Sequence, residues 1–337
     1  MRTERNVIYF PYMRVPENEW FTRVLLYWDN IYAIVPTFAI DEIVGDYMGG
    51  LMQEGLIITI DPDEHIRKIP RFSEAFLEWV DAPEYPVPRD IHTRKRMPKT
   101  AIHTGKLEVG IIGNALEERG LADFHRGPYA QIESYTADLY MAYLAANLGQ
   151  RPIFNSTPIT DKARYLASFA AVDQQKRDWD REFDEMRTVV LNNILPAPSG
   201  GVPPREIADF KRENKTLLKH FRNKLESVLL DAAPMTDLEL RKRKINQFIF
   251  ETQDKIDEIS EALKARNWNN ITPGRFLGYS ITGLTAFGAV LTGGLIPVVI
   301  AALSAGKTLY DVYRDSKPID IFKGNYAAYA VMAQRKN

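Results

Sequence analysis

The chain has 337 residues, of which 45% are hydrophobic and 26% charged, and its formal net charge is −1. This composition is typical of a globular protein, and the length allows two or three domains with a large buried core. A chain so close to neutral has no overall field that would attract nucleic acid or an acidic membrane. It contains no cysteine, which excludes disulfide scaffolds, thiolate metal sites and thiol catalysis.

The first 60 residues alternate between short apolar runs and helical patterns. Apolar runs rich in β-branched and aromatic residues occupy 7–10, 31–35 and 56–60. Helical stripes occupy 16–28 and 43–52, and Gly55 can cap the second of them. Two strand–helix–strand units at this spacing predict an α/β or α+β fold with a small parallel or mixed sheet covered by helices.

The pattern is weaker between residues 62 and 127 and becomes clear again in the helix expected over 134–148. Asp61 is followed by proline and by further acids, which is the pattern of a helix start, so we interpret it as a cap and not as a metal ligand. The expected elements that follow are helices over 72–80 and 134–148, and strands over 107–112 and 153–154.

The remainder of the chain is predicted to be helical. A long helix is expected from residue 160 to about 192, and apolar residues then recur at helical spacings over 207–228 and 245–263. The last two stripes are narrow and predict an antiparallel hairpin in which Phe221 and Ile249 face the partner helix.

Residues 276–306 form the least ordinary segment, because they contain no charged residue. The small and helix-breaking residues in it are Gly278, Gly283, Gly288, Gly293, Gly294 and Pro297. Breaks at Gly293, Gly294 and Pro297 leave pieces near or below the length that spans a bilayer. The segment therefore fits a buried helical hairpin, a membrane insertion or an oligomer interface. The expected domains are 1–155 (α/β), 156–270 (helical, with the long hairpin) and 271–337 (the apolar segment and tail).

The densest basic stretch is residues 92–106. Its candidate contacts for a phosphate or a nucleic acid are His92, Arg94, Lys95, Arg96, His103 and Lys106. Aromatic residues that would stack on bases are not interleaved with these cations, so we favour a solvated loop. No other pattern specifies catalysis, and we expect neither a cofactor nor a metal.

Several short segments resemble a bacterial protein family of unknown function. They are Val7-Ile-Tyr-Phe-Pro-Tyr12, Leu26-Tyr-Trp-Asp29, Ile34-Val-Pro36, Tyr140-Met141, Leu144-Ala145, Pro158-Ile-Thr-Asp161 and Asn193-Ile-Leu-Pro196, with Asp209-Phe-Lys211 and Phe221-Arg222 near the place of a Phe-Arg pair in that family. The resemblance implies a bacterial or phage-derived cytoplasmic protein. It brings no activity, so no functional residue can be carried over.

Two functions remain open at this point. The first is a non-enzymatic effector or assembly protein whose apolar hairpin acts on a membrane or in an oligomer; a role in bacterial defence or stress fits only by analogy of architecture. The alternative is a phosphodiesterase or nuclease that uses residues 92–106 with acids of the α/β part. We favour the first. The expected partner is a second copy or another protein, with a membrane as the alternative and nucleic acid not expected. The expected location is the cytoplasm, with conditional association with the inner membrane.

Overall fold

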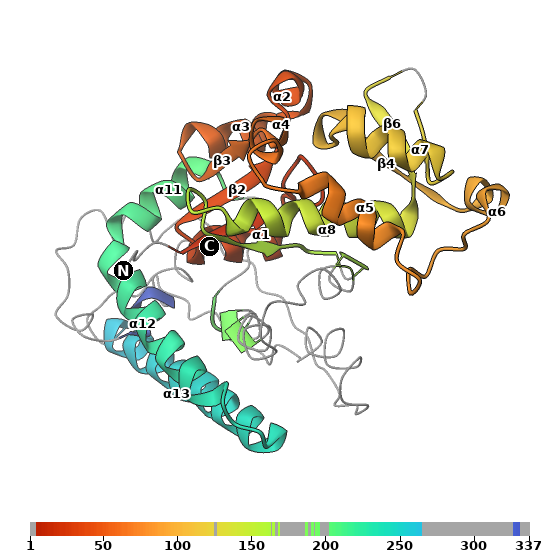
Figure 1. Ribbon diagram of the computed structural model, residues 1–337. Coiled ribbons are helices and arrows are strands. Elements are labelled where there is room, and N and C mark those ends of the chain that lie inside the picture. The colour runs from red at the N-terminus through yellow and green to blue at the C-terminus, as the bar shows by residue number, and fades with distance from the viewer. Residues whose placement is uncertain are drawn as a thin grey trace. The chain divides into compact units, whose positions relative to one another are not determined.

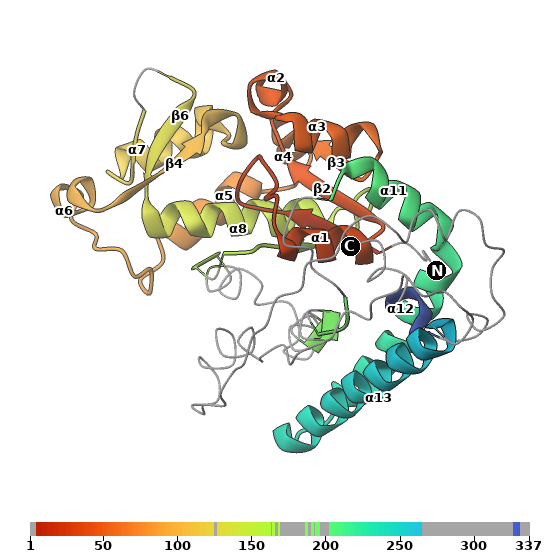
Figure 2. The ribbon, with the colours of Figure 1, turned by 180° about the vertical axis from the view of Figure 1, so that it is seen from behind.

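The computed structural model describes residues 5–124, 127–162, 202–264 and 326–330, together with short pieces between 164 and 195. The chain divides into two compact units (Figures 1 and 2). The α/β unit contains residues 1–16 and 28–175, and the helical unit contains residues 17–27 and 176–337. The predicted fold class, an α/β N-terminal part followed by helices, is confirmed. The predicted division at residues 155 and 270 stays a prediction.

The α/β unit is built on a parallel sheet of four strands in the order β3-β2-β1-β7. The strands are β1 (Asn6–Tyr9), β2 (Asn30–Ile34), β3 (Ile57–Ile60) and β7 (Ser156–Ile159). The first three coincide with the predicted apolar runs. The strand predicted over 153–154 is wrong, because the amides of Phe154 and Asn155 both donate to the carbonyl of Arg151 in a turn. The fourth strand begins after this turn.

Short helices connect the first three strands. They are α1 (Glu19–Tyr27), which belongs to the helical unit, then the 3-10 turn η1 (Thr37–Ala39), α2 (Ile40–Ile43) and α3 (Asp46–Gln53). Gly55 follows α3 with a φ of 69°, a conformation that costs glycine little. The predicted cap at Gly55 is therefore confirmed.

A segment of about seventy residues lies between β3 and the next long helix and carries a second, antiparallel sheet of order β4-β6-β5. Its elements are α4 (Pro62–Ile66), α5 (Phe72–Val80), α6 (Ile91–Arg96), β4 (Lys99–His103), η2 (Thr104–Lys106), η3 (Val109–Gly113), α7 (Asn114–Glu118), β5 (Ala122–Asp123) and β6 (Tyr129–Glu133). The predicted helix over 72–80 is confirmed. The strand predicted over 107–112 is wrong, because the amides of Ile111 and Ile112 donate to the carbonyl of Glu108 in a π-helical turn.

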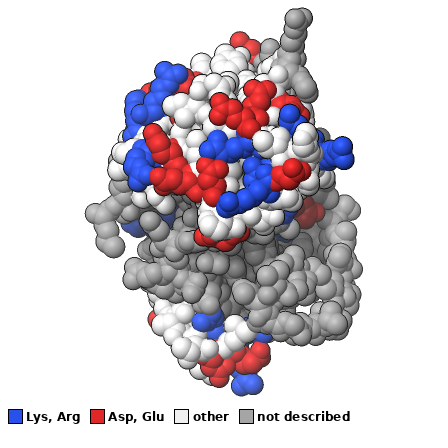
Figure 3. All heavy atoms as spheres, turned by 45° about the vertical axis from the view of Figure 1, so that its right-hand side comes forward, with Lys and Arg blue, Asp and Glu red and all other residues white. Residues whose placement is uncertain are grey.

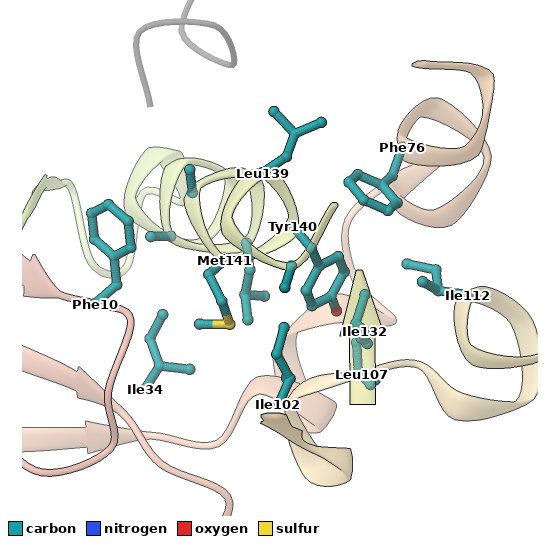
Figure 4. Close-up of a cluster of buried hydrophobic side chains, with 14 of the residues drawn as sticks. Phe10, Ile34, Phe76, Ile102, Leu107, Ile112, Ile132, Leu139, Tyr140 and Met141 are labelled. Atoms are coloured by element: carbon teal, nitrogen blue, oxygen red, sulfur yellow. The ribbon is translucent and has the colours of Figure 1, made fainter. Parts of the chain in front are cut away.

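Helix α8 (Ser134–Gln150) organises the core of the α/β unit, since it contacts strands of both sheets. Figure 4 shows Tyr140 and Met141 of α8 among side chains from the parallel sheet, the antiparallel sheet and α5. The helix approaches β7 closely at Gly149, where a Cβ atom would lie 2.4 Å from the carbonyl oxygen of Ser156. This close packing fixes β7 beside β1 in the sheet.

The helical unit contains α1 and three further described helices, α11 (Pro204–Glu213), α12 (Lys215–Ala232) and α13 (Leu238–Lys264). The stripe predicted over 207–228 is divided between α11 and α12 at Asn214, whose side-chain amide donates to the carbonyl of Phe210 at 2.9 Å. Helices α12 and α13 lie side by side (Figures 1 and 2). The buried positions of α13 include Phe248 and Thr252, whereas Ile249 is only partly buried, so the predicted stripe is shifted by one residue there.

Residues 276–306, including the glycines and Pro297 named above, lie outside the described residues. Among the helices that the structure describes, none is long and apolar enough to cross a membrane.

Candidate functional site

The strand order places a topological switch point between β1 and β7. From β1 the chain moves outward on one side to β2 and β3, and it returns to the other side of β1 only at β7. All these strands are parallel, so the carboxyl ends of β1 and β7, at Tyr9 and Ile159, lie at the same edge of the sheet. In open α/β sheets, ligands bind outside the carboxyl ends of the strands at such a point.

The segments that leave β1 and β7 carry a group of polar and aromatic side chains, joined by one side chain of α8. We call this group the switch-point cluster. Its members are Tyr9, Tyr12, Asp138, Asp161, Lys162, Arg164 and Tyr165. The two segments are far apart in sequence, and it is the β1–β7 pairing that brings them together.

One half of the switch-point cluster is centred on Asp161. Its carboxylate accepts a hydrogen bond from the Tyr9 hydroxyl at 3.4 Å and lies 2.7 Å from the Lys162 ammonium. The Asp161 side chain is 9% exposed and that of Lys162 is 44% exposed. The hydrogen bond between Lys162 and Asp161 raises the pKa of Lys162. Burial, together with the nearby Asp161 carboxylate, raises the pKa of Tyr9. The Lys162 ammonium has three donors, so the pair with Asp161 leaves capacity for another anion.

The other half is centred on Arg164. Its guanidinium pairs with Asp138 of α8 at 3.3 Å and lies over the Tyr165 ring, 4.5 Å from the centroid. The Arg164 side chain is half exposed, whereas Tyr165 is buried. Burial raises the pKa of Asp138, an effect that Arg164 opposes. Tyr12 meets the Tyr165 ring edge to face at 6.4 Å and leaves 45% of its own surface exposed.

The loop after β1 is held by a hydrogen bond from the side chain of Lys106. The Lys106 ammonium is buried and donates to the carbonyl of Pro11 at 2.7 Å, and the Tyr140 hydroxyl donates to the Lys106 carbonyl at 2.7 Å. Burial lowers the pKa of Lys106 to about 7. Lys106 therefore holds the segment that carries Tyr12 and is not available to a ligand in solution.

The basic stretch 92–106 does not form one contact surface. Arg94 is buried and donates to the carbonyls of Pro88 and Arg119, and the ring of buried His103 accepts from the Gly105 amide at 3.1 Å. The interpretation of the stretch as a solvated loop is therefore wrong for Arg94, His103 and Lys106, which stabilise the fold. The remaining three candidates, His92, Lys95 and Arg96, lie exposed on the short helix α6.

Charge is mixed on the part of the surface that Figure 3 shows. On the face shown in Figure 3, basic and acidic side chains are interspersed and do not separate into fields of one sign. Within the described residues, no group of three or more histidine and carboxylate side chains is arranged to hold a metal ion.

Asp61 performs the role predicted for it. Its carboxylate accepts from the Asp63 amide at the start of α4 and from the Thr37 amide, at 3.1 and 3.0 Å. These hydrogen bonds lower the pKa of Asp61, although its partial burial has the opposite effect. The interpretation of this acid as a helix cap is confirmed.

The sequence analysis did not select the members of the switch-point cluster as site residues. Two of the segments quoted for the predicted resemblance, 7–12 and 158–161, are the ends of β1 and β7 and the residues that follow them, and the resemblance itself stays a prediction. Comparisons with protein-family models, with curated proteins and with solved structures found no match for the chain.

Proposed function

We propose that this chain is a non-enzymatic bacterial effector or assembly protein whose α/β unit binds a small anionic ligand at the switch-point cluster. The observation that carries the proposal is the convergence of exposed cationic and aromatic side chains at the carboxyl ends of β1 and β7. Parallel α/β sheets use this position for ligands more than any other.

The chemistry of the switch-point cluster specifies a class of ligand. Lys162 and Arg164 are half exposed, so both can donate charge-assisted hydrogen bonds to a phosphate or carboxylate group. The exposed Tyr12 ring lies beside them and offers an apolar surface for a planar group. A ligand that joins an anionic group to a planar ring, as a nucleotide does, satisfies both.

The binding proposal is tested by calorimetric titration with ATP as the probe. The wild-type chain should bind ATP, while adenosine and inorganic phosphate should each bind more weakly. Lys162→Ala should weaken ATP binding about tenfold, because a charge-assisted hydrogen bond is lost. The matched control is Lys68→Ala, since Lys68 also pairs with a neighbouring acid, Glu64 at 3.2 Å, but is remote in sequence and exposed in the turn that follows α4.

Three results would overturn the binding proposal. One is that ATP does not bind the wild-type chain. Another is that Lys68→Ala weakens binding as much as Lys162→Ala does. The third is that phosphate alone binds as tightly as ATP, since the planar ring would then contribute nothing.

The part of the chain through which the effector acts is proposed from the sequence. Residues 276–306 carry no charge. We propose that the protein resides in the cytoplasm and that these residues act in self-association, in binding to another protein or in association with the inner membrane. We also propose that the chain belongs to the bacterial family that it resembles. Fractionation of cells that express the intact chain or a chain lacking 276–306 tests it. We expect only the intact chain to appear in an oligomer or membrane fraction. Identical distributions of the two chains would refute the role proposed for residues 276–306.

A further inference from the structure

Both cations of the switch-point cluster are already paired with a poorly exposed carboxylate. The Lys162 ammonium lies 2.7 Å from Asp161, and the Arg164 guanidinium lies 3.3 Å from Asp138. The side chains of the two acids are 9% and 12% exposed, whereas those of the two bases are 44% and 50% exposed. When all four groups are ionised, their charges sum to zero. A ligand anion therefore gains little from the switch-point cluster unless it displaces one of the two acids.

The two ion pairs differ in how the acid is held. The Asp161 carboxylate also accepts a hydrogen bond from the Tyr9 hydroxyl. In the other pair, the Oδ1 atom of Asp138 that faces Arg164 is buried and accepts no hydrogen bond from the residues that the structure describes. Asp138 is fixed on α8 in the core of the α/β unit, while Arg164 is half exposed. The pair of Asp138 and Arg164 is thus the one that an incoming anion can separate at the lower cost.

The charges around Asp138 favour a carboxyl group that gains a proton when it loses Arg164. Burial raises the pKa of Asp138; Arg164 and the Tyr165 hydroxyl oppose this rise, and Glu133 at the end of β6 adds to it. These three are the titratable groups that act on Asp138 within the described part of the chain, and Arg164 is the cation among them. A ligand anion that takes the guanidinium removes its effect and adds a negative charge, so the pKa of Asp138 rises further.

We propose that Asp138 determines which anions the switch-point cluster accepts: it occupies Arg164 until a phosphate group displaces it, and on displacement it takes up a proton from the solvent. The inference rests on the proposed binding of a nucleotide-like ligand. A ligand carboxylate has the charge and shape of the Asp138 group, which is already in place, so it competes poorly. A phosphate monoester carries a charge of about −1.5 to −2 and three acceptor oxygens, which is enough to displace a carboxylate.

Proton uptake is the first test. Calorimetric titration of the full chain with ATP, in buffers that differ in ionisation enthalpy, counts the protons taken up on binding. Phosphate groups themselves titrate near a pKa of about 6, so the count is compared with that of Asp138→Asn, which keeps the side-chain shape and cannot ionise. The wild-type chain should take up more protons per ATP than the variant between about pH 5 and 7. Its affinity relative to the variant should therefore fall as the pH rises.

Selectivity is the second test. At pH 8, Asp138→Asn should bind ATP about tenfold more tightly than the wild-type chain, because no charged partner competes for Arg164. The same substitution should improve the binding of adenosine-5′-carboxylate by a larger factor than that of adenosine monophosphate. Asp81→Asn is the matched control. Asp81 also pairs with an arginine, Arg119 at 2.6 Å, but is not a member of the switch-point cluster, so this substitution should change neither the affinity nor the proton count.

A third variant covers the case in which Asp138→Asn does not fold, as judged by circular dichroism. Arg164→Gln changes a half-exposed position and leaves Asp138 with no guanidinium to lose. The excess proton uptake of the wild-type chain should then be absent, although ATP binds more weakly. Excess uptake that persists in Arg164→Gln would contradict the exchange.

The outcomes separate this inference from the proposed function. If the wild-type chain does not bind ATP, the proposed function fails and the inference fails with it. If ATP binds with the same proton count and affinity in the wild-type chain and in Asp138→Asn, the inference alone is refuted. Weaker binding by Asp138→Asn would also refute it, because Asp138 would then position Arg164 for the ligand. An equal gain in affinity for Asp81→Asn would show only a general effect of removing negative charge, and would overturn the inference.

Discussion

Replacing Phe221 by alanine should lower the free energy of unfolding by about 3–5 kcal/mol. Phe221 is fully buried, meets the Tyr27 ring at 6.4 Å and stacks on Tyr329, so its removal leaves a cavity bordered by aromatic rings. Urea denaturation followed by far-UV circular dichroism measures the change.

The control for this substitution is Phe250→Ala. Phe250 lies on α13 and is 69% exposed, so its removal should change the free energy of unfolding by no more than about 0.5 kcal/mol. An equally small change for Phe221→Ala would contradict the packing described for the helical unit.

Glu226→Ala should also destabilise the helical unit by about 3–5 kcal/mol, because it breaks a buried ion pair. The Glu226 carboxylate accepts two hydrogen bonds from the Arg187 guanidinium, at 2.8 and 3.0 Å, and a third from the Tyr27 hydroxyl at 2.8 Å. Only 10% of the Arg187 side chain and 12% of the Glu226 side chain are exposed. The substitution therefore removes the acceptor of two hydrogen bonds from Arg187 and of one from Tyr27.

Thermal and urea unfolding of three variants separates the charge from the packing. Glu226→Gln should be less destabilising than Glu226→Ala, since it keeps an acceptor for Tyr27. Glu64→Ala removes an exposed pair with Lys68 and should cost no more than about 1 kcal/mol. Equal costs for Glu226→Ala and Glu64→Ala would show that the buried pair contributes no more than a surface one.

The parts of the fold that could be predicted are those set by local patterns. The strands β1, β2 and β3 are mainly apolar runs bounded by proline, glycine or aspartate, and β1 and β2 are buried along almost all of their length, as parallel strands tend to be. Helix α5 has the predicted bounds because its apolar residues recur at helical spacing. Local sequence therefore determined the class of the fold and three of the four strands of the parallel sheet.

The parts of the fold that could not be predicted depend on contacts between residues that are far apart in the sequence. Strand β4 lies inside the basic stretch and is held by β6, so nothing in residues 99–103 alone indicates a strand. The burial of Arg94 and Lys106 was not visible either, because each donates to backbone carbonyls supplied by other segments. In a sequence, such cations look the same as solvated ones.

The switch-point cluster was missed for the same reason. Tyr12 becomes a neighbour of Tyr165, and Arg164 a neighbour of Asp138, only because β7 pairs with β1 and not with β3. A sequence shows strands without their order in the sheet, and it is the order that creates a switch point. The site could be located only after the topology was known.

Hydrogen exchange of the full chain, followed by mass spectrometry with and without saturating ATP, tests the ligand site most directly. We expect ATP to slow exchange in peptides that span 10–16 and 160–165, which follow β1 and β7 in the sequence, and to leave 92–97 unchanged. Protection confined to 92–97, or bound ATP that protects neither loop, would contradict the assignment of the ligand to the switch-point cluster.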